Sequence, residues 1–463
     1  MSKLKNTTFH IVDSPRRDLV WRLVLARKLQ KAGIESFIGR ADSISYLAQF
    51  KSNAILCGRL GGTSGRSNFD IELISLLEKR KSKIFYIHDE GGAFRDSDYE
   101  RETKLNYPSD LFNNAVFQKI YFWGERQKIV FEGENWLNKS KIIGAPRFDV
   151  LKQKNKSNSS TKDIMQMNYF EKLKPYVLIN SRFSNVLTSK DDVSALSRRM
   201  FDIRVEGGDR NNKSDDEIKQ AMFSRWTTSA HDYIAFIEML SKLCLEFKDI
   251  NFVLRPHPAE DDEWYIKNLE LIPNIRIEKQ GDVQLAIENA EIVIGSDCTT
   301  GLEAILLGKN YINFIPFPNK GENTVGLAEI GSIVNSYEEI IKCLRGFLDG
   351  QNIQSTSLSI FDDSIINVNS DKNAINEMFL DIKYYFNNLP NRNTNNLFTL
   401  NSFLSIKSIK HFIKFLISPW RDIKNPGSKY ILPNKKEIID TWVKMGGNKK
   451  DIKFGYNYIK IKS

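Results

Sequence analysis

The chain has 463 residues with a formal net charge of +10 at pH 7, and 41% of the residues are hydrophobic. A chain of this length is too long for one ordinary hydrophobic core, so we expect two domains and an appendage. No apolar run approaches the roughly 20 residues of a membrane span, and the N-terminus lacks the apolar core of a signal peptide, which favours a cytoplasmic protein. The four cysteines lie far apart, without the spacing of a zinc site, and are expected to be free thiols.

The first third of the sequence alternates between short apolar runs and amphipathic segments. This alternation is typical of βαβ units in a parallel sheet. Residues 152–163 are polar and without periodicity, so we place a linker at 152–175. The strands are expected at 8–14, 53–58, 83–89, 119–124 and at the start of 140–151, and the helices at 16–33 and 69–81.

A second alternation begins at residue 176 and predicts a second doubly wound domain. Its strands are expected at 176–183, 250–256, 291–296 and 311–316, with a returning strand at 274–279, and its helices near 230–247 and at 282–290 and 301–309. The predicted organisation is an N-terminal Rossmann-like acceptor and catalytic domain at 1–151, the linker, a C-terminal Rossmann-like nucleotide-sugar domain at 176–350, and a basic helical extension at 351–463.

The segment VLRPHPAEDDEW at 253–264 ends a predicted strand in Arg-Pro-His-Pro. The two prolines fix the backbone on either side of His257 and hold its imidazole in one direction. An oriented histidine beside Arg255 suits the binding of a phosphate oxygen. The alternative is a proline-rich turn that carries a histidine by chance.

The segment IGSDCTTGLEAILLGK at 294–309 places hydroxyl groups and a glycine between a buried strand and a helix. Hydroxyls and free backbone N–H groups at a helix start can bind an anion without a lysine. Glu303 is placed to accept hydrogen bonds from ribose hydroxyls if a nucleotide lies across the turn. The alternative is helix capping, for which Ser and Thr are favoured in any case.

The segment IHDEGGAFRDSDYE at 87–100 places His88, Asp89 and Glu90 between a predicted strand and a glycine pair. Charged side chains on such a loop can approach a ligand closely. Adjacent carboxylates can serve as base, nucleophile or acid, because their mutual repulsion separates their pKa values. The alternative is a solvated loop without a chemical role.

Two further strand ends carry an arginine, in GAPRFD at 144–149 and in INSRF at 179–183. Arg147 and Arg182 are candidates to bind a substrate carboxylate or phosphate. Each is explained equally well as an ordinary surface arginine.

The basic residues of 402–463 account for the whole positive excess of the chain. Within this segment, SFLSIKSIKHFIKFLISPW at 402–420 spaces apolar residues as on one face of a helix, with lysines on its flank. A basic amphipathic helix is typical of an element that lies on an anionic membrane surface. The alternative is a helix that packs on the protein itself. A basic tail also suits nucleic acid, but we find no nucleic-acid-binding motif and expect no such partner.

Two doubly wound domains in tandem resemble the GT-B architecture of glycosyltransferases. RPHP followed by GSDCTTGLEAILLGK resembles the His-Pro and Ser/Thr motifs of bacterial transferases that use CMP-activated sugars. HDEGGAFRD resembles the Glu-Asp-Gly type loop of the β-Kdo transferases of capsule and O-antigen synthesis and of related surface-carbohydrate biosynthesis proteins. The resemblance covers roughly residues 80–320.

The resemblance implies that His257 and Pro258 contact the nucleotide phosphate and that Asp89 or Glu90 is the acidic group near the reacting carbon. The order here is Asp-Glu-Gly-Gly rather than Glu-Asp-Gly, so the acting carboxylate and the stereochemistry stay open. The hydroxyl motif near the phosphate would be Ser296, Thr299 and Thr300; the nucleotide site would also include Arg255, Gly301 and Glu303, and the substrate contacts would be His88, Gly91, Arg147 and Arg182.

These features predict a glycosyltransferase that moves a sugar, Kdo or a related ulosonic acid, from a CMP-activated donor to a surface polysaccharide or its lipid-linked precursor. Its partners would be the nucleotide sugar, the glycan acceptor and the inner face of the cytoplasmic membrane, bound through 402–463. No metal or cofactor is expected, because positive groups can neutralise the leaving monophosphate. One alternative is a CDP-glycerol or CDP-ribitol phosphotransferase of the same fold, and another is a non-catalytic, membrane-associated protein of polysaccharide assembly.

Overall fold

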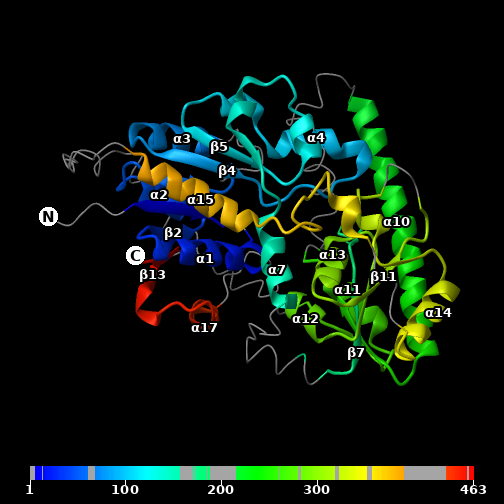
Figure 1. Ribbon diagram of the computed structural model, residues 1–463. Coiled ribbons are helices and arrows are strands. Elements are labelled where there is room, and N and C mark those ends of the chain that lie inside the picture. The colour runs from blue at the N-terminus through cyan, green and yellow to red at the C-terminus, as the bar shows by residue number, and fades with distance from the viewer. Residues whose placement is uncertain are drawn as a thin grey trace. The chain divides into compact units, whose positions relative to one another are not determined.

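The computed structural model of the chain forms two compact units, each built on its own sheet (Figure 1). Unit 1 comprises Met1–Gly92, Glu100–Asp163 and Phe361–Ser463, and unit 2 comprises Ala93–Tyr99 and Ile164–Ile360. The structure describes residues 6–12, 14–60, 68–156, 170, 173–184, 186–187, 215–258, 260–279, 283–318, 323–351, 357–389, 434–455 and 458–463.

Unit 1 contains an eight-stranded sheet in the order β13-β14-β2-β1-β3-β4-β5-β6. The strands from β1 to β6 pair in parallel, whereas β14 pairs antiparallel with both β2 and β13. The strand bounds are β1 Thr7–Ile11, β2 Glu35–Gly39, β3 Ile55–Cys57, β4 Lys83–Ile87, β5 Phe117–Phe122, β6 Ser140–Ile142, β13 Ile452–Gly455 and β14 Tyr458–Ile461. β2 lies where no strand was predicted.

Helices cover both faces of this sheet, which explains why its central strands are buried along their whole length. α1 packs with α7 and α15 on one face, and α2 and α3 pack on the other. α1 begins with a proline at its first position and has lysines in its last turn, as favoured at helix ends. The helix bounds are α1 Pro15–Lys31, α2 Ala41–Ala48, α3 Asn68–Lys79, α4 Tyr99–Asn106, α5 Ser109–Phe112, α6 Glu125–Ile129, α7 Pro146–Lys156, α15 Ala374–Asn387 and α17 Lys435–Lys444.

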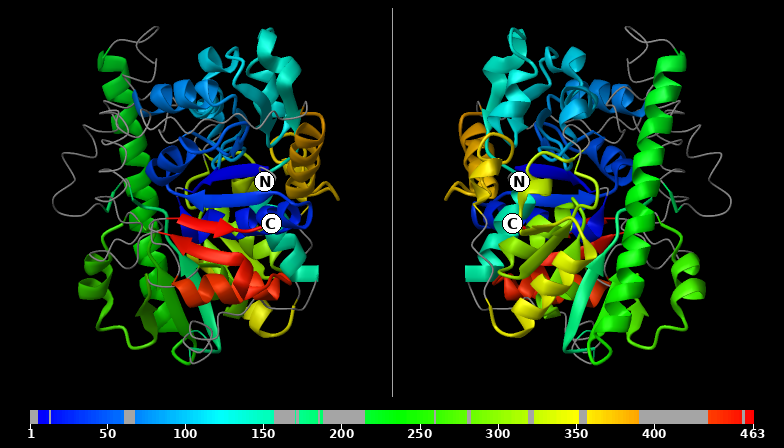
Figure 2. Two further views of the ribbon diagram at one scale, coloured as in Figure 1. Left: turned by 90° about the vertical axis from the view of Figure 1, so that its left-hand side faces the viewer. Right: turned by 90° about the vertical axis from the view of Figure 1, so that its right-hand side faces the viewer.

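The C-terminal segment completes unit 1 and is not a separate extension. Figure 2 shows the C-terminal strands beside β2, and in β14 both Ile459 and Ile461 are fully buried against the sheet. Earlier in the chain, Asn367 donates to Asp149 Oδ1 at 2.7 Å and anchors its own segment to α7. The predicted boundaries of 151 and 351 therefore differ from the observed units, because apolar side chains after residue 360 complete the core of unit 1. The predicted basic helix at 402–420 lies outside the described residues.

Unit 2 contains a six-stranded sheet in the order β12-β11-β10-β7-β8-β9, and every neighbouring pair is parallel. The predicted returning strand, β9, runs parallel to β8 because α11 first carries the chain back across the sheet. The strand bounds are β7 Tyr176–Asn180, β8 Asn251–Arg255, β9 Ile275–Ile277, β10 Ile292–Gly295, β11 Asn310–Phe314 and β12 Ser332–Val334.

The helices of unit 2 include the long α10, which begins well before the predicted start near residue 230 (Figure 1). The bounds are α10 Asp215–Glu246, α11 Asp262–Leu269, α12 Val283–Asn289, α13 Thr299–Leu306 and α14 Tyr337–Leu348. Both units therefore have the predicted doubly wound α/β fold, and a pair of such units is what the GT-B architecture contains. None of the helices in the described part of the chain is long and apolar enough to cross a bilayer.

Candidate functional site

The strand order of unit 2 creates a topological switch point between β7 and β10. The chain leaves β7 toward β8 through α10, and it leaves β10 in the opposite direction, toward β11, through α13. Ligands of doubly wound sheets bind beyond the carboxyl ends of the strands at such a point. The predicted motifs lie at these ends, since Arg182 follows β7, His257 follows β8 and Ser296 follows β10.

Arg182 joins two carboxylates at the switch point. Its Nη1 donates to Asp297 Oδ2 at 3.1 Å, and its Nη2 donates to Asp232 Oδ2 at 3.0 Å. Burial raises the pKa of both carboxyls, and the charge of Arg182 opposes that rise. The Arg182 side chain is only 19% exposed, so it is a fixed cation within unit 2 and not an ordinary surface arginine.

Asp297 is the residue that the sequence analysis did not select in this cluster. It adopts a left-handed backbone conformation with a φ of 43°, and its N–H donates to Asn313 Oδ1 at 2.9 Å. Thr324 donates to its carboxylate through both the backbone N–H and the hydroxyl. The signal that could have found Asp297 is its place as the single acid between a buried strand and a helix start.

The Arg-Pro-His-Pro turn is held by Ser181 and Glu260. The backbone N–H of His257 donates to Ser181 Oγ at 3.0 Å, and Ser181 Oγ donates to Glu260 Oε2 at 2.5 Å. Glu260 also accepts from the Tyr265 hydroxyl at 3.0 Å and from the backbone N–H of Phe183. This buried network fixes the turn that carries His257. The sequence predicted that the two prolines hold this turn, and neither Ser181 nor Glu260 was predicted to take part.

The residues on either side of His257 differ in exposure. Arg255 is 8% exposed, and its guanidinium lies 5.9 Å from the ring centroid of Phe170, where a cation–π contact is favourable. Pro258 is exposed and His257 is half-buried. The imidazole is therefore the more accessible of the two basic groups in this turn.

The start of α13 carries the predicted hydroxyl cluster. The N-cap is Cys298, which makes no side-chain hydrogen bond to the first turn, so neither Ser296 nor Thr299 is the cap. Ser296 is buried and Thr299 is half-buried. The Oγ1 of Thr300 is buried and has no hydrogen-bond partner in the part of the chain that the structure describes. A buried hydroxyl without a partner is costly, so it is a candidate to contact a ligand or water.

Gly301 and Glu303 occupy positions that differ from their predicted roles. A Cβ at Gly301 would lie 2.3 Å from Cζ of Tyr311, and the Gly301 N–H already donates to the Cys298 carbonyl at 2.9 Å. The glycine therefore makes room for the tyrosine ring. Glu303 lies in the second turn of α13 and is only 5% exposed.

The pKa of Glu260 makes the stability of unit 2 depend on pH. Burial raises this pKa from 4.5 to about 7, and hydrogen bonds from Ser181 and Tyr265 oppose the rise. The folded state therefore holds a proton that the unfolded state has lost between pH 4.5 and about 7, and stability falls as pH rises through this window. When the pH is raised from 5 to 8, we expect the titration of Glu260 to lower the free energy of unfolding by on the order of 3 kcal/mol.

Urea unfolding of the wild type and of Glu260→Gln at pH 5 and pH 8 measures this contribution. The neutral glutamine should remove it, so the pH dependence should be smaller in the variant. Glu263→Gln is the matched control, because its carboxylate is 70% exposed and pairs with Lys267 at the surface. Equal pH dependence in wild type and Glu260→Gln would contradict the assignment.

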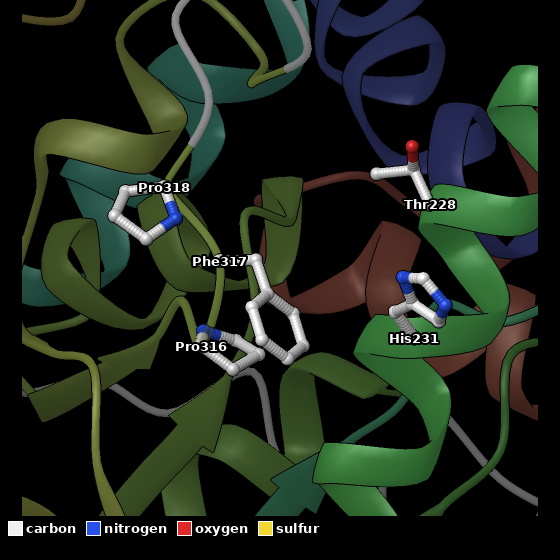
Figure 3. Close-up of a pocket in the computed structure, with 5 residues that line it drawn as sticks. All are labelled: Thr228, His231, Pro316, Phe317 and Pro318. Carbon is white, nitrogen blue, oxygen red and sulfur yellow. The ribbon is translucent and has the colours of Figure 1, made fainter.

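A cavity of about 370 Å³ lies in unit 2 between α10 and the segment after β11. It is lined by Thr228, His231, Pro316, Phe317 and Pro318. In Figure 3 the imidazole of His231 on α10 faces the ring of Phe317. The two rings form an edge-on pair with their centroids 6.2 Å apart. The cavity lies beyond the carboxyl end of β11, the strand next to β10 of the switch point. None of these lining residues was predicted from the sequence.

In unit 1, the acidic loop after β4 holds Asp89 in a buried ion pair. Arg22 Nη2 donates to both carboxylate oxygens of Asp89 at 2.8 Å. The Arg22 side chain is fully buried and that of Asp89 is 2% exposed. Asp89 is therefore a structural partner of Arg22, a role that the sequence analysis did not foresee because Arg22 lies in a distant helix.

Glu90 is the accessible carboxylate of this loop. Its side chain is 50% exposed and accepts from Arg17 Nη1 at 2.8 Å. Arg17 also pairs with the buried Asp18 at 2.9 Å. Of the two acids that the sequence left open, only Glu90 has a side chain that a substrate can reach.

His88 is 3% exposed, and its Nδ1 lies 2.6 Å from the carbonyl oxygen of Glu90. Burial and the charge of Arg59 lower its pKa to about 4, so the imidazole is neutral at pH 7. This burial does not support the predicted substrate contact.

The other two predicted contacts in unit 1 also pack against side chains of the protein. A Cβ at Gly91 would lie 2.5 Å from Nε2 of Gln127. The Arg147 guanidinium lies 5.4 Å from the ring centroid of Trp123 and 4.7 Å from that of Phe148. Among the described residues, no group of three or more His, Cys, Asp or Glu side chains is placed to hold a metal ion.

No protein-family model matches the chain, and no curated protein matches it. Among solved structures, the chain is similar to a UDP-GlcNAc 2-epimerase of Methanocaldococcus jannaschii, with 12% identity, a TM-score of 0.47, and coverage of 82% of this chain and 99% of that one. It is also similar to the wall teichoic acid polymerase TagF, with 13% identity, a TM-score of 0.43, and coverage of 84% and 91%. Anabaena HepE matches with 10% identity, a TM-score of 0.39, and coverage of 83% and 100%. At these identities the likeness concerns the fold alone.

Proposed function

We propose that this protein is a glycosyltransferase that binds a nucleotide-activated sugar at the switch point of unit 2. The observation that carries the proposal is the gathering of oriented polar groups at the carboxyl ends of three neighbouring strands. Arg182 is fixed by two carboxylates, His257 is held by Ser181 and Glu260, and Thr300 has a buried hydroxyl without a described partner. The basic side chains of His257 and Arg255 and the Thr300 hydroxyl suit a phosphate group, which needs positive charge and hydrogen-bond donors together, whereas the charge of Arg182 is balanced by its two carboxylates.

The finer proposal is that the donor is a CMP-activated ulosonic acid such as Kdo, and that the acceptor is a surface polysaccharide or its lipid-linked precursor. It is supported by the resemblance of RPHP and GSDCTTGLEAILLGK to the motifs of CMP-sugar transferases. In this scheme His257 and Arg255 neutralise the charge that develops on the leaving phosphate. Association of 402–463 with an anionic membrane surface belongs to the same proposal and is supported by its basic composition.

For catalysis we assign the acid–base role to Glu90. Its carboxylate is half exposed, whereas that of Asp89 is occupied by Arg22. In an inverting reaction Glu90 would take the proton of the acceptor hydroxyl as the new glycosidic bond forms and the bond to the nucleotide breaks. In a retaining reaction its carboxylate would attack the anomeric carbon and displace the nucleotide, forming a glycosyl-enzyme. The acceptor oxygen would then bond to the same carbon as the bond to Glu90 breaks, and the hydroxyl proton would pass to the released carboxylate.

A nucleotide panel tests the donor. We expect CMP to raise the unfolding midpoint more than CDP, UDP or GDP, since a ligand at 100 times its Kd stabilises the native state by about 2.7 kcal/mol. His257→Ala should lose most of this shift, while the control Glu263→Ala, at an exposed position in the neighbouring helix, should keep it. A larger shift with CDP would instead favour the CDP-alditol phosphotransferase, and no shift with any nucleotide would overturn the proposal.

Release of CMP from CMP-Kdo in the presence of a glycan acceptor separates an enzyme from a binding protein. Wild-type protein that binds CMP but releases none from the donor would support the non-catalytic alternative.

A further inference from the structure

We propose that the cavity between α10 and the segment after β11 is a subsite for a single pyranose ring, which stacks on Phe317. This inference deepens the proposed function and depends on it for the identity of the sugar. The walls of the subsite are Thr228 and His231 on α10 and the run Pro316, Phe317 and Pro318 (Figure 3).

The size of the cavity favours one ring over a whole nucleotide sugar. Its volume of about 370 Å³ is at the lower end of the roughly 300–1,000 Å³ of small-molecule sites. The Phe317 side chain is 51% exposed, so its ring face is available to a ligand. A large aromatic group that is half exposed beside a cavity is a ready stacking platform.

The chemistry of the walls favours a sugar over a nucleobase. Pro316 and Pro318 have no backbone N–H, and the Thr228 hydroxyl already donates to the carbonyl of Ser224 at 3.1 Å. The edge of a cytosine would leave hydrogen-bonding groups unsatisfied against such a wall, which is costly. A pyranose instead presents a C–H face to Phe317 and keeps its hydroxyls toward His231 and solvent.

The position of the cavity links it to the proposed nucleotide site. His231 and Asp232 are consecutive residues of α10, and Asp232 accepts from Arg182 Nη2 at 3.0 Å. Arg182 in turn contacts Asp297, which directly follows Ser296 of the hydroxyl motif. Pro316, Phe317 and Pro318 follow β11, the neighbour of β10, so a ring on Phe317 would lie at the same carboxyl edge of the sheet as the turn after β10 that carries Asp297.

Saturation-transfer NMR with free Kdo as the probe tests the subsite. We expect saturation of the Kdo ring protons by the wild-type protein, and an increase of the Kdo dissociation constant by about fivefold to tenfold in Phe317→Ala. His231→Ala should weaken Kdo binding as well. Phe223→Ala is the matched control, because Phe223 is 70% exposed on the same helix but does not line the cavity.

The sugar can come from the donor or from the acceptor, and a competition arm separates the two. Intact CMP-Kdo displaces free Kdo if the cavity holds the donor ring, and leaves it bound if the cavity holds an acceptor ring. Unchanged Kdo binding in both cavity variants overturns the subsite. Loss of saturation at the cytosine protons of CMP in Phe317→Ala also overturns it, because the ring on Phe317 would then be the nucleobase. Failure of CMP to bind the wild type, with Kdo binding still dependent on Phe317, overturns the proposed function and leaves the subsite standing.

Discussion

Replacing Asp89 with alanine is expected to lower the free energy of unfolding of unit 1 by about 3 kcal/mol, the lower end of the range for breaking a buried ion pair. The variant leaves the guanidinium of Arg22 fully buried without its bidentate partner. The neighbouring His10 supplies no negative charge in place of Asp89; burial and the charge of Arg22 lower its pKa to about 3, so it is neutral. Asp18 offsets part of the loss. Burial and the charge of Asp89 raise the pKa of its carboxyl, so removal of Asp89 relieves a repulsion and favours the ionised form of Asp18.

Denaturant unfolding followed by tryptophan fluorescence measures this effect, because Trp123 and Trp136 are buried in unit 1. Glu90→Gln is the matched control. Its half-exposed side chain should change stability by less than about 0.5 kcal/mol. The same variant should reduce turnover by about 10²-fold to 10⁴-fold if Glu90 is the general base. If Asp89→Ala unfolds like the wild type but abolishes turnover, then Asp89 is the reacting carboxylate and our assignment is wrong.

A companion variant tests the ion pair itself. Asp89→Leu combined with Arg22→Met removes both charges and should recover most of the lost stability. A double variant as unstable as Asp89→Ala would show that packing around the pair, and not the uncompensated charge, causes the loss.

Substituting alanine for Gly301 is expected to destabilise unit 2 by about 1–3 kcal/mol. The new Cβ would lie 2.3 Å from Cζ of Tyr311, a fully buried ring that Gly295 and Gly331 also approach closely. The ring must shift, and its hydroxyl hydrogen bond to Asn313 shifts with it. Asn313 also accepts from the backbone N–H of Asp297, so the disturbance reaches the switch point.

The measurement is urea unfolding combined with the CMP shift. Tyr311→Leu in the Gly301→Ala background should restore part of the stability by making room for the new methyl group, whereas Tyr311→Phe should not, since it keeps the ring carbon. A Gly301→Ala variant of normal stability that no longer responds to CMP would instead support the direct nucleotide contact predicted from the sequence.

The apolar runs of the central strands were sufficient to predict β1, β3, β4, β5, β7, β8, β10 and β11, because strands buried on both faces are apolar throughout. The C-terminal strands were missed for a physical reason. In β14 the half-buried Lys460 separates the buried Ile459 from the buried Ile461, and this alternation forms a strand only where a sheet edge is available to pair with it. No local pattern shows that β2 provides that edge.

The sequence was sufficient to locate the turns of the candidate site but not the ion pairs that their side chains form. Strand ends can be located from apolar runs, so the turns that carry Arg182, His257 and Ser296 were placed correctly, after β7, β8 and β10. Which charges those turns bury depends on partners distant in the sequence. Asp232 lies 50 positions from Arg182, and Arg22 lies 67 positions from Asp89. Only the folded chain brings these pairs together, and they decide which side chains are structural and which remain accessible.

The antiparallel strand β14 is synthesised much later than β2, the strand with which it pairs. Gln30 Nε2 donates to the carbonyl of Lys462 across 432 positions, so β2 is made long before the strand that covers its edge. During translation the open edge of β2 can pair with other chains, because uncovered strand edges promote aggregation. A chain that stops before residue 452 leaves that edge uncovered permanently. Quality control that acts on exposed sheet edges would therefore distinguish completed from interrupted copies of this protein.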